Sequence, residues 1–313
     1  MRSKEYHEHI QAVIDETGID DPREAVRQKA RALISRLSPL FPNPPPFNMN
    51  EMASCIGLHS SDEEPTFSAD SEIAPDCEGR VVLRVNKSRP LTRQRFSIAH
   101  EIGHTLFPDY HLAVRCRKAH DNRWNDDDFL ETLCDAAASE FMFPLPWFNE
   151  KLESLDFTGS NLAQLADDCL ASREAMARRI VELAETPMAA VYFSWKLKPL
   201  EQMQVRRDAK QVFLFANLVP EQPVAKLRVD YAIMNDAYRA NVPVHIPKHK
   251  SIENCGPIFQ AAITQLPCNG EAALQFGKSE SEFDVVALPI YTDEKDLGPD
   301  GAVSVVAILR PVV

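Results

Sequence analysis

The stretch Arg95-Phe96-Ser97-Ile98-Ala99-His100-Glu101-Ile102-Gly103-His104 contains an H-E-x-x-H pentapeptide within apolar residues at helical spacing. Residues four apart share one helix face, so His100 and His104 can direct two imidazole nitrogens to one Zn²⁺ at about 2.0–2.1 Å. Glu101, between them, can reach the attacking water as a general base. The pattern therefore predicts a zinc hydrolase site, against the alternative of a solvated helix that exposes two histidines.

Composition is that of an ordinary globular protein. The chain has 313 residues, of which 44% are hydrophobic and 26% charged, with a mean hydropathy of -0.28. It contains no run of about 18 apolar residues, and its first residues include no apolar targeting segment. We therefore expect a cytoplasmic protein that does not span a membrane.

Charge and cysteine usage exclude several classes of function. A net charge of -12 argues against direct DNA binding, which depends on neutralising phosphates with lysine and arginine. The seven cysteines include no C-x-x-C pair, which argues against a disulfide framework and a zinc ribbon.

The segments around the pentapeptide predict a helix that starts near 92 and ends by Pro108, since proline cannot continue it, and a second helix from about 128 to 142. The β-branched run 80–86 predicts a strand, which either forms the edge on which an extended substrate lies or is a plain core strand. The acidic, turn-rich segment 60–76 predicts a surface loop.

A zinc site of this kind needs a third protein ligand. Phe107 and Tyr110 stand where a metzincin has glycine and histidine, so that form is excluded. Asp109 is one candidate, but it follows a helix-breaking proline. Glu131, near the start of the next helix, is the stronger candidate. Asp135, one turn further along the same face, is placed to accept the outer N–H of a ligand histidine.

Two short helices are predicted in 161–184, in an arrangement that resembles a helix-turn-helix. The segment 161–185 holds three basic and five acidic residues. Because this balance repels phosphate, we interpret the helices as structural or partner-docking elements. Beyond them, the chain predicts strands at 189–193, 212–215, 227–231, 285–290 and 303–309, and a helix around 257–265.

The pentapeptide and its flanks are followed by four further matching positions or short stretches, namely Glu131, Cys134-Asp135, 138–141 and Phe143-Pro144. With these motifs, the chain resembles the ImmA/IrrE family of bacterial and phage metallopeptidases over about residues 50–195. The resemblance implies a gluzincin-like site with His100, His104 and Glu131 as ligands and Glu101 as general base. It implies a cytoplasmic enzyme that cleaves a helix-turn-helix repressor or antitoxin and so switches on stress-response or mobile-element genes.

The predicted fold is α+β. We expect N-terminal helices in 1–48, a mainly helical zincin-like peptidase domain with a small sheet in 49–157, a helix-turn-helix-like segment in 158–198, and a separate α+β domain in 199–313, which we consider as a sensor.

The predicted activity is metal-assisted peptide hydrolysis with Zn²⁺, or with Mn²⁺ as the alternative metal, on a protein substrate. Tyr110, His111 and His120 are candidates for stabilising the oxyanion. A non-catalytic, metal-stabilised regulatory protein that binds a partner is the competing hypothesis. The sequence leaves the substrate and the oligomeric state open.

Overall fold

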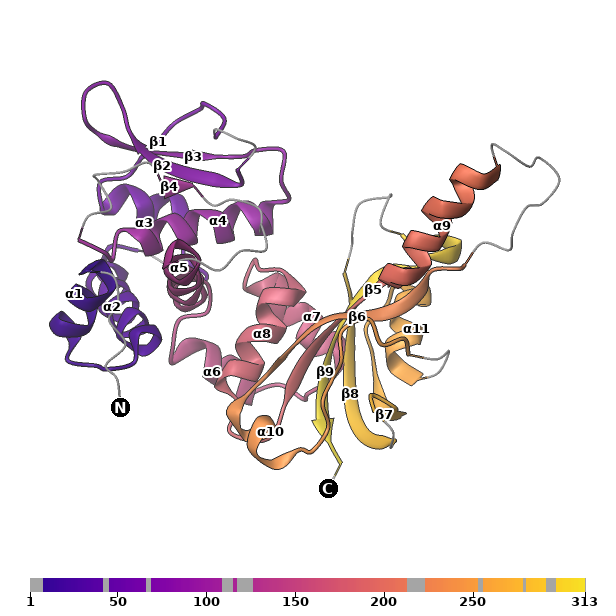
Figure 1. Cartoon of the computed structure of the whole chain (residues 1–313). Helices are drawn as coiled ribbons and strands as arrows, with labels where there is room; N and C mark the ends of the chain where they lie inside the picture. The colour runs from indigo at the N-terminus through magenta and orange to yellow at the C-terminus, as the bar shows by residue number, and fades with distance from the viewer. Residues whose placement is uncertain are drawn as a thin grey trace. The chain divides into compact units, whose positions relative to one another are not determined.

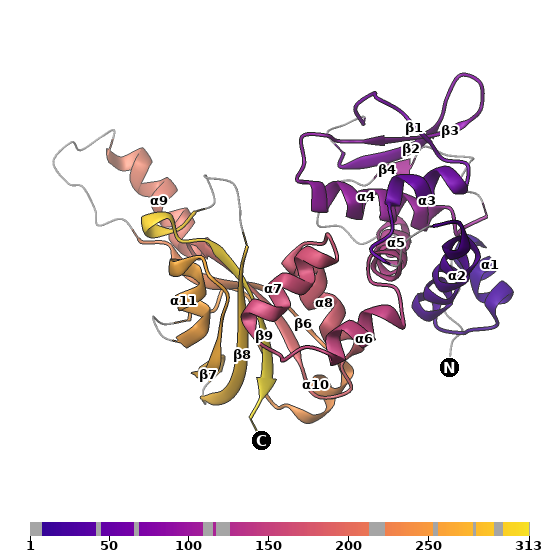
Figure 2. The same cartoon turned by 180° about the vertical axis from the view of Figure 1, so that it is seen from behind.

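Helices and two β-sheets form a mixed α+β fold, as predicted, with one sheet in each of two units (Figure 1 and Figure 2). The computed structural model describes residues 8–41, 45–65, 69–108, 115–116, 126–212, 223–252, 256–277, 280–290 and 297–312. The first unit comprises Met1–Leu155 and Leu165–Ser172, and the second comprises Asp156–Gln164 and Arg173–Val313. In the described ranges, no helix is long and apolar enough to cross a membrane.

The first unit begins with α1 (Glu8–Thr17) and α2 (Pro22–Leu37), followed by the short turn η1 (Ser38–Leu40) and by α3 (Met49–Cys55). Helix α2 begins at Pro22, within the segment 1–48 where N-terminal helices were predicted. The Asp21 side chain accepts a hydrogen bond from the backbone N–H of Arg23, and Pro22 occupies the first helical position, where no N–H is needed.

A four-stranded sheet follows, in the order β1-β3-β2-β4. Its strands are β1 (His59–Ser60), β2 (Ser71–Pro75), β3 (Val81–Val85) and β4 (Arg115–Cys116). The strand predicted at 80–86 is confirmed as β3. It pairs with β1 on one side and β2 on the other, so the prediction of a substrate-binding edge is wrong and the core-strand alternative is right.

The surface loop predicted over 60–76 is wrong for its last part. Residues 71–75 form β2, and four of these five residues are buried. Turn-forming and acidic residues favour a loop locally, but pairing with β3 and packing against the motif helix override that preference. The error matters because Ser71 contacts the pentapeptide.

The pentapeptide lies at the end of α4 (Leu91–His104), and the next helix is α5 (Asp126–Met142), as predicted. Helix α4 is covered on one side by the sheet and on the other by α5 (Figure 1 and Figure 2). All residues from Ser97 to His104 are therefore buried. A helix that is covered on both sides can hold polar groups away from bulk water.

Helices α6 (Trp147–Glu153), α7 (Gly159–Asp168) and α8 (Arg173–Leu183) follow. The two short helices predicted within 161–184 correspond to α7 and α8, which residues 169–172 connect. Leu170 in this connection has a φ of 51°, a left-handed conformation that suits a tight turn.

The second unit contains an antiparallel five-stranded sheet in the order β6-β5-β9-β8-β7. Its strands are β5 (Ala189–Lys196), β6 (Lys226–Met234), β7 (Cys268–Leu274), β8 (Ser281–Ile290) and β9 (Ser304–Pro311), and its remaining elements are α9 (Pro199–Val212), α10 (Asp236–Asn241), α11 (Gly256–Thr264) and η4 (Pro299–Gly301). Four of the predicted strands and the predicted helix are confirmed. The strand predicted at 212–215 is not, because Val212 ends α9; residues 213–215 lie outside the described ranges.

Helices α8 and α11 cover opposite faces of this sheet (Figure 1 and Figure 2). The α11 face carries alternate residues of the central strands, such as Val191, Phe193 and Val305, in one buried core. On the α8 face, Tyr192 stacks on Tyr231 with a centroid distance of 4.2 Å, and the Tyr231 hydroxyl donates to Glu174 of α8. Both faces are thus apolar and covered, which explains the hydrophobic strand sequences.

Candidate metal centre

The Nε2 atoms of His100 and His104 both face the carboxylate of Glu131. His100 Nε2 lies 3.0 Å from Glu131 Oε2, and His104 Nε2 lies 3.4 Å from Glu131 Oε1. The histidines come from the last turns of α4 and the glutamate from α5, so packing of the two helices brings together residues about 30 positions apart. The three residues predicted as metal ligands therefore lie together.

The outer nitrogen of His100 also has a carboxylate partner. Nδ1 of His100 donates to Asp135 Oδ1 at 2.9 Å, which is the contact predicted for Asp135. Burial lowers the pKa of His100, but hydrogen bonds with Asp135 and Glu131 outweigh this effect and raise the pKa to about 9. The metal-free chain therefore holds His100 in its protonated form at neutral pH.

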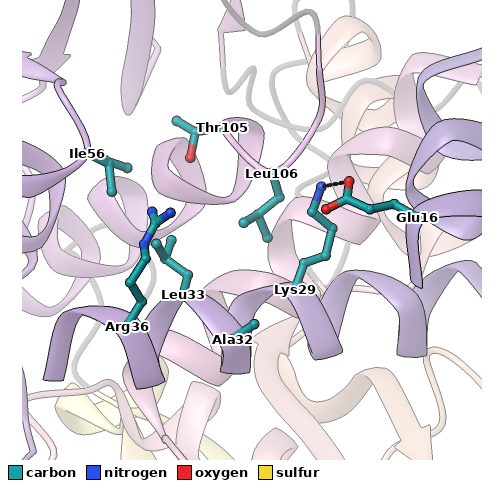
Figure 3. Close-up of a pocket in the computed structure, with 8 residues that line it drawn as sticks. All are labelled: Glu16, Lys29, Ala32, Leu33, Arg36, Ile56, Thr105 and Leu106. Atoms are coloured by element: carbon teal, nitrogen blue, oxygen red, sulfur yellow. Dashed lines mark hydrogen bonds and ion pairs between the residues drawn. The ribbon is translucent and has the colours of Figure 1, made fainter.

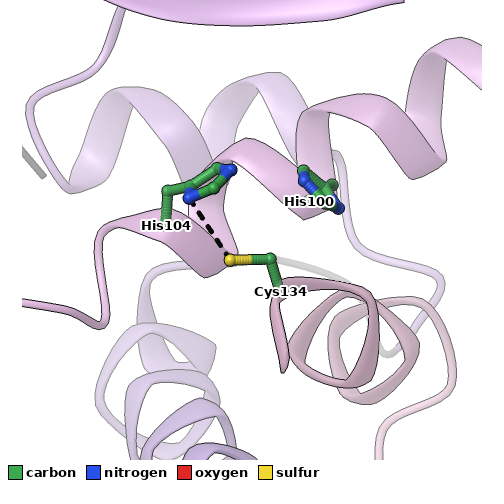
Figure 4. A group of neighbouring side chains, drawn as sticks. All are labelled: His100, His104 and Cys134. Carbon is green, nitrogen blue, oxygen red and sulfur yellow. Dashed lines mark hydrogen bonds between the residues drawn. The ribbon is translucent and has the colours of Figure 1, made fainter. Parts of the chain in front are cut away.

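Cys134 contacts the outer nitrogen of His104, a relationship that the sequence reasoning missed. Its Sγ lies 3.3 Å from His104 Nδ1, and Figure 4 shows this contact between α4 and α5. Glu131, Cys134 and Asp135 are three and four residues apart on α5, so they share one helix face. That spacing was a signal that could have identified Cys134.

Two sets of ligand atoms are therefore possible. Atoms of His100, His104 and Cys134 lie within 4.8 Å of one another and form one set. The second set consists of His100, His104 and Glu131. In this set, the Nε2 atoms of both histidines face the Glu131 carboxylate, and the Nδ1 atom of each histidine contacts a different residue. We prefer the second set because Cys134 lies at the Nδ1 side of His104, away from Glu131.

This donor set fits a divalent metal. Two imidazole nitrogens and one carboxylate are ligands that Zn²⁺ accepts, and such a set leaves a coordination position for water or substrate. Hydrogen-bonded outer nitrogens are the usual support for ligand histidines, since they fix the orientation of the ring. Asp135 and Cys134 occupy those positions here.

Glu101 is fully buried and contacts the sheet. Its Oε1 accepts a hydrogen bond of 2.6 Å from the hydroxyl of Ser71 in β2. His100 and His104 are equally enclosed, with exposed fractions of 1% and 0%. Glu131 and Asp135 are more accessible, with 34% and 26% of their side chains exposed, so the centre is open to solvent mainly on the α5 side.

Four residues weighed from the sequence lie outside the described residues. These are Asp109, the other candidate for third ligand, and the oxyanion candidates Tyr110, His111 and His120.

A pocket lies further along the first unit, beside the residues that follow α4. It has a volume of about 440 Å³, and Thr105 and Leu106 line it together with Lys29 and Arg36 of α2 (Figure 3). The side chains of His100, Glu101 and His104 do not line it, so it is separate from the candidate metal centre.

Residues 61–181 match a peptidase family model described as the IrrE N-terminal-like domain. The radiation response metalloprotease IrrE of Deinococcus radiodurans is 36% identical over 118 residues, which are 37% of this chain and 35% of that protein. Its namesake from Deinococcus deserti is 36% identical over 96 residues, which are 30% of this chain and 33% of that protein.

The chain thus spans about a third of the length of the curated relatives it matches. One solved structure, a transcriptional regulator of Mycobacterium tuberculosis, has a TM-score of 0.52 and 13% identity, covering 97% of this chain and 80% of that one. At this identity the likeness shows the fold alone. The pentapeptide, Glu131 and Asp135 all lie within residues 61–181, so the part of the chain that is similar to the IrrE N-terminal-like peptidase domain includes the candidate metal centre.

Proposed function

We propose that this protein is a zinc-dependent endopeptidase whose substrate is a helix-turn-helix repressor or antitoxin. The observation that carries the proposal is the convergence of two histidine Nε2 atoms on the Glu131 carboxylate, next to Glu101 on the same helix. The match of residues 61–181 to a peptidase family model and the likeness to two metalloproteases support the reaction class. The relatives' names support a role in stress response, and the family resemblance also suggests mobile-element regulation.

His100, His104 and Glu131 would hold the metal, with Asp135 and Cys134 orienting the two imidazoles. Bound Zn²⁺, or Mn²⁺, would polarise the scissile carbonyl and make water more acidic. Glu101 takes a proton from the attacking water as the oxygen bonds to the carbonyl carbon. It then delivers that proton to the amine nitrogen as the C–N bond breaks. The two steps leave Glu101 ionised and ready for another turnover.

One observation favours a second candidate function, a non-catalytic regulator stabilised by its metal. His100, Glu101 and His104 are at most 1% exposed, so a peptide must displace neighbouring groups before it reaches the glutamate. A structural metal site needs no access for a substrate, whereas a catalytic site keeps a coordination position open to water or substrate. The partial exposure of Glu131 and Asp135 supports the peptidase.

Cleavage of a defined set of proteins distinguishes the two functions. The probes are the purified helix-turn-helix repressors and antitoxins encoded in the same genome, incubated with the protein and either Zn²⁺ or Mn²⁺. We expect one new amino terminus, found by mass spectrometry, which is absent when a chelator is added. If the metal-loaded protein cleaves no member of the set, the regulator is supported instead.

Glu101→Gln tests the assigned base. This variant should bind metal as the wild type does and lower kcat by at least about 100-fold, since it loses general-base catalysis. Glu78→Gln, a matched change in an exposed turn, should cleave normally. Undiminished cleavage by Glu101→Gln would remove Glu101 from the mechanism.

A further inference from the structure

Ser71 is a buried polar residue in a strand whose other residues on the same face are apolar or at the strand's end. Its exposed fraction is 0%, and so is that of Ile73, two residues further along β2 on the same face. Burying a hydroxyl without a hydrogen bond is unfavourable, because its bonds to water are lost and not replaced. A serine at this position therefore needs a partner, and its partner is Glu101.

The geometry identifies the acceptor of the serine proton. The Ser71 hydroxyl oxygen lies 2.6 Å from Glu101 Oε1 and 3.5 Å from the carbonyl oxygen of Ser97. A hydroxyl has one proton to donate, and bonds to a carboxylate are short and strong. The proton therefore goes to Glu101, and the carbonyl contact is at most a weak second one.

We infer that Ser71 is the positioning residue for Glu101, an inference that rests on the proposed peptidase function. With Oε1 held by the strand, the torsions of the glutamate side chain are restricted, and the position of Oε2 is set as well. Glu101 then has its Oε1 atom anchored to β2, and the carboxylate is held in one orientation for its role as general base. A base held in place needs no reorganisation at the moment of proton transfer.

The position of the strand makes this anchor stiff. Ser71 is opposite Val85 in the antiparallel pairing of β2 with β3, so its backbone is part of the sheet ladder. Helix α4, which carries Glu101, packs on the same sheet. The hydrogen bond therefore joins two elements whose separation is already set by packing.

The inference is tested by measuring kcat and KM with the repressor that the protein is found to cleave as the substrate. Ser71→Ala should lower kcat by about 10–100-fold, the usual effect of losing a supporting contact, with KM and metal content unchanged. Ser71→Thr retains the hydroxyl and should recover most of the activity. Ser304→Ala, which removes a buried strand serine in the second unit, is the matched control and should cleave like the wild type. An unchanged kcat in Ser71→Ala would overturn the inference.

An infrared measurement tests the contact without any substrate. Subtracting the spectrum of Glu101→Gln from that of the zinc-loaded wild type isolates the Glu101 carboxylate bands. The same subtraction on a Ser71→Ala background should give shifted bands, because one oxygen has lost its hydrogen bond. Identical bands would show that Ser71 does not hold Glu101. Since this comparison needs no cleavage, a failure to find any cleaved repressor counts against the proposed function and leaves the infrared result to decide the contact.

Discussion

Gly103 of α4 lies against the backbone of Cys134 in α5. A Cβ atom at Gly103 would be 3.0 Å from the carbonyl oxygen of Cys134 and 3.2 Å from its Cα. Only glycine therefore allows this approach of the two helices without a shift. The approach places Glu131 under His100 and His104, so the glycine in the pentapeptide has a direct structural role in the metal centre.

Gly103→Ala should weaken metal binding as well as the fold. The methyl group meets backbone rather than a flexible side chain, so the helices must separate, at a cost of about 1–3 kcal/mol in the free energy of unfolding. Better helix propensity offsets part of this cost. Urea unfolding and zinc titration of the purified variant measure both effects. Gly277→Ala, where a Cβ meets nothing within 4 Å, is the control, and equal behaviour of the two variants would contradict the prediction.

Asp135 should control metal affinity through His100. Asp135→Ala removes the acceptor for Nδ1 and should lower zinc affinity by about 10–100-fold, the range seen when such supporting carboxylates are lost. Asp135→Asn keeps an acceptor oxygen without the charge and should lie between the alanine variant and the wild type. Competition with a chromophoric chelator gives the three affinities. Equal affinities would show that the contact does not support the ligand.

Cys134 should support His104 without binding the metal. With Co²⁺ in place of zinc, the protein should show no sulfur-to-cobalt charge-transfer band, because the preferred ligands are two nitrogens and a carboxylate. Cys134→Ala should still bind one metal ion per chain. A charge-transfer band that disappears in Cys134→Ala would instead assign the thiolate as a ligand.

The metal-free protein should lose stability as pH rises. The folded-state pKa of His100 is about 9, above its ordinary value of 6.5. The stabilisation from its two carboxylate partners is therefore complete below pH 6.5 and is lost as pH rises through 9. The shift corresponds to a loss of about 3 kcal/mol at most. Urea unfolding at several pH values with a chelator present measures this change.

His100→Asn supplies the reference for that pH series. It has no group that titrates at this position, so its free energy of unfolding should depend less on pH across the same range. A parallel pH dependence in the variant and the wild type would show that the effect comes from other groups.

Local sequence was sufficient for the elements whose side chains repeat at a helix or strand period. Apolar spacing predicted α4 and α5, and the four-residue separation placed both histidines on one face. Glu131 was predicted from its place near the start of the second helix, and Asp135 from its position one turn further along the same face. These features depend on residues a few positions apart, which interact in the same way wherever the helix lies.

Contacts between segments far apart in the sequence could not be predicted from local spacing. Ser71 lies in a stretch with the composition of a loop, and only pairing with β3 makes it a strand and turns its hydroxyl to Glu101. Cys134 reaches His104 because the helices approach closely at Gly103. The sequence by itself thus determined the chemical groups and their spacing along each helix. Tertiary structure decided which groups meet, because those distances depend on how closely separate elements pack.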